Sequence, residues 1–192
     1  MPTPREPWSA KLLPSLVGLL WLSIFVVAVI LEKGALHFSV SATTLLRLGA
    51  LRVPPHFAAD YLRVASCWLL HVDLWHLLSN LVVLTVVTWR WTPSAGAMLP
   101  PLLLGIVGAG FSSLLLSPQP MVSCGGSGVL LSWLLVLLLS LPRWRERVLP
   151  GLMAMLLLGG GLLTGADGTA HLGGLAAGGL AALLPSRRKV TA

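Results

Sequence analysis

The stretch SCGGSGVLLSW, residues 123–133, places a serine hydroxyl among glycines at the start of a run that is otherwise leucine and valine. Two glycines precede Ser127 and a third follows it. The first N–H groups of a helix have no partner within the helix, and the positive end of its dipole lies there. The run beginning at Ser127 is short, because roughly 20 residues are needed to cross a membrane. Ser127 is therefore expected to begin a helix below a membrane surface.

The composition indicates a membrane protein. Of the 192 residues, 56% are hydrophobic and 10% are charged, and the mean hydropathy is +0.88. Soluble domains carry roughly a quarter charged residues. The net charge of +7 does not indicate nucleic-acid binding, because the basic residues form short clusters between apolar runs and act there as topology signals. The partner that the composition predicts is the lipid bilayer.

We predict an all-α membrane protein, a bundle of six transmembrane helices in a single domain over residues 1–192. The expected helices are approximately residues 12–31, 74–92, 97–116, 127–141, 148–164 and 169–185. The first is not expected to be a cleaved signal peptide, because the sequence after it, VILEKGALHF, offers no small-x-small cleavage site.

The distribution of Lys and Arg predicts the orientation. With the N-terminus inside, the cytoplasmic side collects Arg5, Lys11, Arg90, Arg143, Arg145, Arg147, Arg187, Arg188 and Lys189. The outer side holds Lys33, Arg47, Arg52 and Arg63. Nine against four predicts that both termini are cytoplasmic.

The four outer basic residues all lie in one long loop, about residues 32–73, between the first two expected helices. Its segment TTLLRLGALR, residues 43–52, alternates basic and apolar faces, which is typical of a helix lying in the membrane interface. A loop this long and apolar is expected to fold against the membrane surface. The segment 117–126, before the short fourth helix, is expected to be irregular backbone that lines a cavity at membrane depth.

Four polar residues stand within the expected spans, where polar side chains are costly and indicate function. They are His76, Asn80, Ser127 and His171. In the predicted topology the second, fourth and sixth helices all run from outside to inside. All four residues then fall within about the first two turns of their helices and share one depth.

The spacing of these residues supports one site. His76 and Asn80 are four residues apart and share a helix face. His171 shares a face with Gly174 and Gly178, a small-residue pair that lets membrane helices approach closely. Such an approach is required for a serine–histidine hydrogen bond between helices.

The chemistry that fits this pattern is nucleophilic catalysis. Ser127 would attack a carbonyl carbon, and the helix N-terminus with His76 and Asn80 would stabilise the oxyanion. His171 would take the serine proton and return it to the leaving amine. Asp167 is expected at the surface, a turn before the histidine, so a dyad is predicted in place of a triad. No cofactor or metal is expected, since the HExxH string of metalloproteases is missing.

Each residue also has an ordinary structural interpretation. A serine at a helix start is commonly an N-cap, a histidine in an apolar helix is commonly a packing residue, and Asn80 could serve helix association alone. The coincidence of all four at one depth favours a site. For Cys67 and Cys124 two alternatives stay open, a disulfide or two buried free thiols.

At these residues the chain resembles the rhomboid intramembrane serine proteases, of the small prokaryotic six-helix type. The family pattern His-x4-His-x3-Asn appears as His71, His76 and Asn80. The pattern Gly-x-Ser-Gly appears as Gly125, Gly126, Ser127 and Gly128, and Ala-His-x-x-Gly-x-x-x-Gly appears as Ala170, His171, Gly174 and Gly178. The loop motif LGAL covers Leu48–Leu51.

The resemblance implies that Ser127 is the nucleophile and His171 its base, with His76, Asn80 and the Ser127 amide around the oxyanion. Two positions depart from the family. The family's Trp-Arg pair in the loop is Leu62-Arg63 here, and a usual aromatic residue four positions after the serine is Leu131.

The resemblance further implies a protease that cuts single-pass transmembrane substrates near their outer ends. It would lie in the cell inner (plasma) membrane, with its active site opening to the outer side. A second interpretation is a catalytically silent rhomboid-like protein that binds membrane clients. That class typically lacks the serine, the histidine or both, whereas this chain has both.

Overall fold

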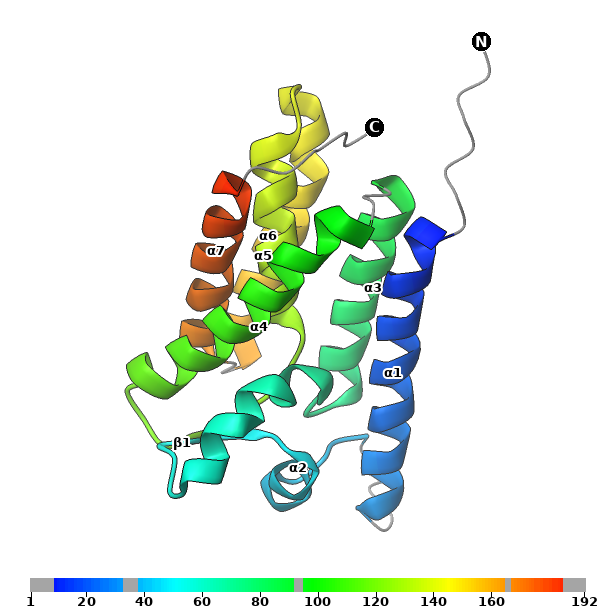
Figure 1. Ribbon diagram of the computed structural model, residues 1–192. Helices are drawn as coiled ribbons and strands as arrows, with labels where there is room; N and C mark the ends of the chain where they lie inside the picture. Colours follow the sequence, from blue (N-terminus) through cyan, green and yellow to red (C-terminus); the bar gives the residue numbers. More distant parts are fainter. Residues whose placement is uncertain (1–8, 33–37, 92–94, 165–166, 185–192) are drawn as a thin grey trace.

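The structure is a computed structural model that describes residues 9–32, 38–91, 95–164 and 167–184. Most of these residues are helical, as predicted, but the chain is not all-α, because the described residues include one short two-stranded sheet. Six helices of 14 to 23 residues run alongside one another and form a bundle (Figure 1). They are α1 (Ser9–Leu31), α3 (Leu74–Arg90), α4 (Ala95–Leu116), α5 (Ser127–Ser140), α6 (Trp144–Thr164) and α7 (Gly168–Leu183).

The ends of these helices differ slightly from the apolar runs in the sequence. α6 begins at Trp144, about one turn before the expected position 148. Its first turn contains Arg145 and Arg147, and a hydropathy window does not register a polar turn that continues an apolar helix. α3 ends at Arg90, and Trp91 is its C-cap residue, so this helix is shorter than expected.

The loop after α1 folds into short elements at one end of the bundle. They are α2 (Ala42–Leu48), β1 (Leu51–Val53) and the 3-10 helices η1 (Ala58–Ala65) and η2 (Cys67–Leu69). The expected interface helix over residues 43–52 is shorter than predicted. It ends at Leu48 because Gly49 adopts a left-handed conformation with φ of 106°, which terminates helices.

The segment before α5 is more regular than the sequence suggested. Met121–Ser123 forms the strand β2, which pairs antiparallel with β1, and Leu51 lies opposite Ser123. The expectation of irregular backbone throughout residues 117–126 is therefore wrong for these three residues. Strands of three residues carry too little alternating pattern to be recognised in a sequence.

α5 is the central helix of the bundle, and most of its residues are buried. By contrast, α1 and α4 present exposed leucines and valines on their outer faces. Among the described helices, the segments 12–31 and 97–116 are long and apolar enough to cross a membrane by length and composition. The apolar helices α3 and α5 are shorter.

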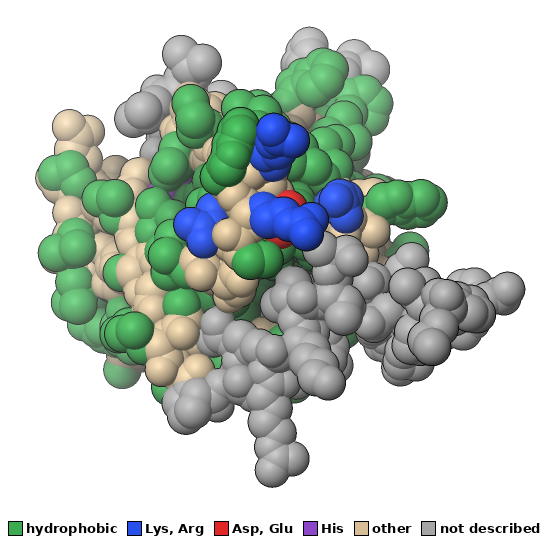
Figure 2. All heavy atoms as spheres, turned by 90° about the horizontal axis from the view of Figure 1, so that it is seen from above, with side chains coloured by type: hydrophobic (Ala, Val, Ile, Leu, Met, Phe, Trp, Pro, Cys, Tyr) green, Lys and Arg blue, Asp and Glu red, His purple; other side chains and the backbone are tan. Residues whose placement is uncertain are grey.

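The starts of α3, α5 and α7 lie at the same end of the bundle, beside α2 and η1 (Figure 1). The opposite end carries basic side chains (Figure 2). On the described helices these are the exposed Arg90 at the end of α3 and Arg143, Arg145 and Arg147 around the start of α6. The two ends of the molecule are thus chemically distinct.

Candidate active site

Ser127 is the first residue of α5, and the preceding Gly126 occupies the N-cap position without a side-chain cap. The Ser127 hydroxyl is therefore not an N-cap. Its Oγ lies 2.8 Å from Nε2 of His171, within hydrogen-bond distance. Both residues are buried. The structure thus brings together the serine and histidine singled out from the sequence, although they are 44 positions apart.

Close contacts of α7 with its neighbours hold His171 near the serine. A Cβ atom at Gly178 would lie 2.5 Å from the Ser132 carbonyl oxygen, and a Cβ at Gly174 would collide with the carbonyl of Gly128. Larger residues at these glycines would push α7 away from α5. The pair Gly174 and Gly178 therefore permits the backbone approach on which the Ser127–His171 contact depends.

His76 and Asn80 lie on α3, facing the same region. The Asp73 side chain caps this helix by accepting a hydrogen bond from the His76 amide at 2.7 Å. Asn80 is fully buried, and its side-chain nitrogen and oxygen have no hydrogen-bond partner among the described residues. A buried amide without a partner is costly, so its donor is available for a group that enters the site.

An open cavity of about 520 Å³ connects these four residues. We call it the α3–α6 cavity, because it is lined by α3, α6, β2 and the starts of α5 and α7. Its lining includes His76, Asn80, Ser127 and His171, together with apolar and small residues of α6. A polypeptide segment that reached this cavity would meet the serine and the histidine in its wall.

Gly125 shapes the wall between the serine and His76. It has φ of 125°, a left-handed conformation that favours glycine. A Cβ atom there would lie 2.5 Å from Cε1 of His76. Both the backbone conformation and the adjacent imidazole therefore require a glycine at this position.

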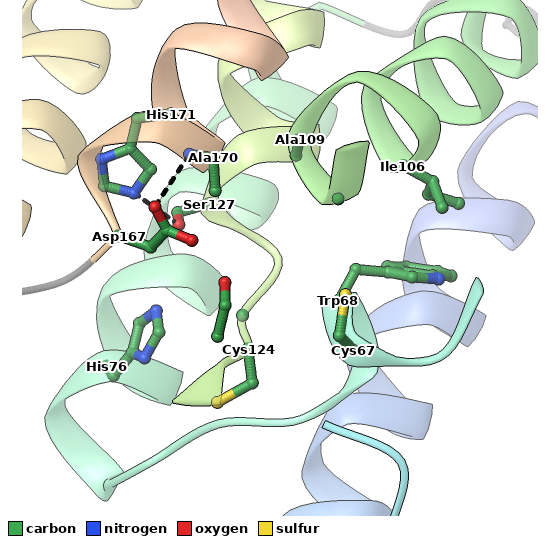
Figure 3. Close-up of a pocket in the computed structure, with 13 residues that line it drawn as sticks. Cys67, Trp68, His76, Ile106, Ala109, Cys124, Ser127, Asp167, Ala170 and His171 are labelled. Carbon is green, nitrogen blue, oxygen red and sulfur yellow. Dashed lines mark hydrogen bonds between the residues drawn. The ribbon is translucent and has the colours of Figure 1, made fainter. Parts of the chain in front are cut away.

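Asp167 was expected at the surface, but it is partly buried and lines a pocket. This placement was not predicted from the sequence. Asp167 lines the pocket beside Ser127 and His171 (Figure 3). Its carboxylate caps α7 by accepting from the amides of Thr169 and Ala170. It also accepts from the Ser113 hydroxyl on α4. The position of Asp167 four residues before the histidine, at a helix start, was the signal in the sequence.

The hydrogen bonds of Asp167 explain its ionisation and occupy its carboxylate oxygens. Burial raises the pKa of this carboxyl, but the bonds from Ser113 and Thr169 outweigh burial, so the pKa lies below its usual value. Among the residues that the structure describes, none of its carboxylate bonds goes to the His171 imidazole. The Ser127–His171 hydrogen bond is consistent with a dyad.

Cys67 and Cys124 are both free thiols. Of the two alternatives that the sequence left open, the structure shows the unpaired one. Burial raises the pKa of each thiol to about 12, so both are protonated at neutral pH. The backbone still links their segments, because the Gly125 amide donates to the Cys67 carbonyl at 3.1 Å.

His71 and Arg63 support the site from the loop. The His71 ring packs edge-on against the His76 ring, with centroids 5.2 Å apart. Arg63 donates from its guanidinium to the carbonyls of Leu46 and Ala50 and pairs with Asp60 at 2.9 Å. These bonds tie η1 to the end of α2.

The two departures noted in the sequence have different surroundings. Leu62 is 76% exposed, so it contributes little to packing within the chain. Leu131 is fully buried in the core, one turn after Ser127. The leucine fills this core position, and the Ser127–His171 distance is 2.8 Å with it in place.

Comparison with known families decides the assignment. The model of the rhomboid domain matches residues 58–188, which is more than half of the chain. The chain belongs to the rhomboid family. A comparison with curated proteins finds no match. The match confirms the resemblance seen in the motifs and begins after α1 and α2, so these two helices lie outside the matched region.

Membership of the rhomboid family has direct consequences. The chain is an integral membrane protein that crosses the bilayer several times, and its helices form a membrane bundle. Rhomboid proteins are mostly serine proteases, and they act on membrane-protein substrates or clients. The hydrogen-bonded Ser127–His171 pair fits that chemistry.

Proposed function

We propose that this rhomboid protein is an intramembrane serine endopeptidase in which Ser127 and His171 form the catalytic dyad. The observation that carries the proposal is the 2.8 Å contact between Ser127 Oγ and His171 Nε2 in a buried site. A serine hydroxyl is a weak nucleophile, and an adjacent imidazole activates it by accepting its proton.

The proposed reaction is acyl transfer in two steps. Ser127 Oγ attacks the carbonyl carbon of a peptide bond while His171 Nε2 takes the hydroxyl proton. The tetrahedral intermediate collapses when the C–N bond breaks, and His171 returns the proton to the leaving amine. Water then attacks the acyl-enzyme while His171 takes one of its protons. The ester C–O bond breaks, His171 returns the proton to Ser127 Oγ, and the carboxylic acid product leaves.

The oxyanion of the intermediate would lie at the start of α5. The Ser127 amide belongs to the first turn, where backbone donors have no partner within the helix. His76 and Asn80 line the same cavity and would add side-chain donors. Loss of one such donor costs about 10²–10³-fold in kcat in a serine protease, whereas loss of the serine or the histidine costs about 10⁶-fold. Substitutions of His76 or Asn80 should therefore lower activity strongly, but less than substitutions of the dyad.

The proposed substrates are single-pass transmembrane proteins, cut near their outer ends. A carbonyl within a helix is hydrogen-bonded and screened, so the substrate must unwind to enter the α3–α6 cavity. Small residues at the cut and helix-destabilising residues nearby would favour that step.

We further propose six membrane spans, with both termini cytoplasmic, in the inner (plasma) membrane. The exposed arginines Arg90, Arg143, Arg145 and Arg147 lie at the end of the bundle away from Ser127. Positive residues favour the cytoplasmic side. The active site would then open to the outer side.

The alternative is a catalytically silent rhomboid protein that binds membrane clients. Such a protein needs the cavity but no activated serine. The two interpretations therefore differ in the reactivity of Ser127.

The decisive experiment is labelling of the detergent-purified protein with a fluorophosphonate probe. We expect the wild type to be labelled and Ser127→Ala and His171→Ala to remain unlabelled. Ser132→Ala is the matched control, because Ser132 is buried on the same helix and donates to the Pro101 carbonyl. It should be labelled like the wild type. A folded wild-type protein that remains unlabelled would support the client-binding alternative.

A further inference from the structure

Trp21 lies in the middle of α1, outside the region that matches the rhomboid domain. Its neighbours Leu20 and Leu22 are exposed, as expected for a helix at the edge of a membrane bundle, but Trp21 is only 1% exposed. Its side chain points into the bundle and contacts two parts of the site that carry no catalytic side chain.

The first contact is with Gly126, the residue immediately before the proposed nucleophile. Gly126 has φ of −78° and ψ of −5°, a conformation open to any residue. A Cβ atom there would lie 2.5 Å from Cη2 of Trp21, and the three nearest atoms all belong to this indole. Glycine is required here because the indole occupies the space, whereas Gly125 is required for its backbone as well.

The second contact is with His71. The centroids of the Trp21 and His71 rings lie 5.2 Å apart, and the rings meet edge-on at 67°. His71 contacts the His76 ring in the same way, at 5.2 Å and 70°. Neither ring nitrogen of His71 has a hydrogen-bond partner among the described residues. Packing therefore determines its position.

We propose that Trp21 is a positioning residue that fixes the oxyanion side of the active site from α1. It holds the backbone before Ser127 through Gly126, and it holds His76 through His71. Trp21 does not touch the reacting atoms. The proposal rests on the proposed function, since the groups it positions matter only if Ser127 reacts.

The expected effect is on the transition state. The Ser127 amide and His76 must point at a developing oxyanion, and a displacement of about 1 Å in an active site can cost 10²-fold in rate. Removing the indole would free Gly126 and His71 without removing any side chain that lines the α3–α6 cavity, because Trp21 is not among its lining residues. The rate of the chemical step should fall while probe binding stays the same.

Saturation kinetics of fluorophosphonate labelling test this expectation, because kinact and KI are measured separately and the labelling endpoint counts intact sites. Trp21→Ala should lower kinact by about tenfold or more with KI within about twofold. Trp21→Phe keeps an aromatic ring at this position, so it should retain most of the wild-type kinact. Phe25→Ala is the matched control, because Phe25 is a buried aromatic residue one turn along α1. It should reduce thermal stability but leave kinact per intact site within about twofold.

A double-mutant cycle tests the direct contact. Gly126→Ala should lower kinact and the melting temperature in the wild type, where the added methyl meets the indole. In Trp21→Ala the same substitution has room, so the double variant should be more active than Gly126→Ala alone. Additive losses, or equal kinact for Trp21→Ala and Phe25→Ala, would overturn the positioning role. An unlabelled wild type would instead reject the proposed function, and the positioning role with it.

Discussion

The two sides of the candidate active site are packed in opposite ways. On one side α7 meets α5 and α4 backbone to backbone, through Gly174 against Gly128 and Gly173 against Gly108. On the other side α3 and α6 are separated by the α3–α6 cavity of about 520 Å³. Ser127 and His171 belong to the closely packed side, while Asn80 faces the open side.

The difference suggests how one small bundle meets two opposed requirements. A serine–histidine hydrogen bond is lost if the two side chains move apart by more than some tenths of an ångström. Close backbone contacts between α5 and α7 provide the rigidity that prevents such movement. A polypeptide substrate needs space, and α6 provides it with small residues. Glycine serves the two sides for different reasons. In α7 it permits backbone contact with α5 and α4, and in α6 it leaves room for the cavity.

The strongest test compares one substitution at two glycines. Gly174→Ala places a methyl against the Gly128 carbonyl, so α7 must move away from α5. We expect a loss of about 1–3 kcal/mol in stability and of about 100-fold in fluorophosphonate labelling, because the dyad separates. Gly160→Ala on α6, at the wall of the α3–α6 cavity, meets no atom within 4 Å. It should be neutral or stabilising by about 0.5–1 kcal/mol.

Thermal unfolding in detergent and labelling rates measure both effects. If Gly160→Ala proved as damaging as Gly174→Ala, the contrast between the two sides would be wrong.

A second test restricts the open side. Ser79 on α3 and Leu156 on α6 both line the α3–α6 cavity. Cysteines at these positions, with Cys67 and Cys124 replaced by alanine, can be linked by a reducible bifunctional thiol reagent. Cleavage of a transmembrane segment should then fall by about tenfold or more, since substrate entry requires the helices to separate. Fluorophosphonate labelling should fall much less, because the probe is far smaller than a transmembrane segment and reaches Ser127 and His171 in the cavity without separation of the helices.

Single-cysteine variants treated with the same reagent are the controls, and reduction of the link should restore cleavage. Undiminished cleavage by the linked protein would reject α3–α6 opening as the entry route.

The sequence predicted the tightly packed side better than its surroundings. His171, Gly174 and Gly178 follow helical spacing, and polar residues are conspicuous in apolar helices, so their common face could be inferred. The contact of Ser127 with His171 then follows from the shared depth of two helix starts. Their catalytic roles remain a prediction.

Other features could not be inferred because they depend on distant partners. Asp167 accepts a hydrogen bond from Ser113, which lies 54 positions away. The β1–β2 pair joins two segments of three residues each. The contact of Trp21 with Gly126 joins an apolar residue of α1 to a glycine, and periodicity does not identify the partner of an apolar residue.

A third test extends the comparison to the loop at the active-site end of the bundle. Arg63→Ala removes charged hydrogen bonds to the carbonyls of Leu46 and Ala50. It should lower stability by about 1.5–3 kcal/mol. Leu62→Trp alters an exposed side chain and should change stability by less than about 0.5 kcal/mol. Thermal unfolding of both variants measures the difference, and a larger effect of Leu62→Trp would mean that this side chain has a binding partner.

The smallest expected effect concerns Asp167, which joins α7 to α4 on the closely packed side. Its pKa in the folded protein lies below the usual value of 3.8, because hydrogen bonds from Ser113 and Thr169 outweigh the effect of burial. A carboxyl with a lowered pKa stabilises the folded state above its unfolded-state pKa, and this stabilisation is lost as the pH falls through the folded-state value.

Asp167→Asn keeps a capping oxygen, so this substitution should lower stability by about 1 kcal/mol or less at pH 7. The melting temperatures of wild type and Asp167→Asn should therefore differ at pH 7 and converge as the pH falls below about 4. Other carboxyl groups titrate in both proteins, so the difference between the two curves isolates Asp167. A constant difference down to acidic pH would mean that the charge of Asp167 does not hold α7 against α4, and that the glycine contacts alone keep His171 in place.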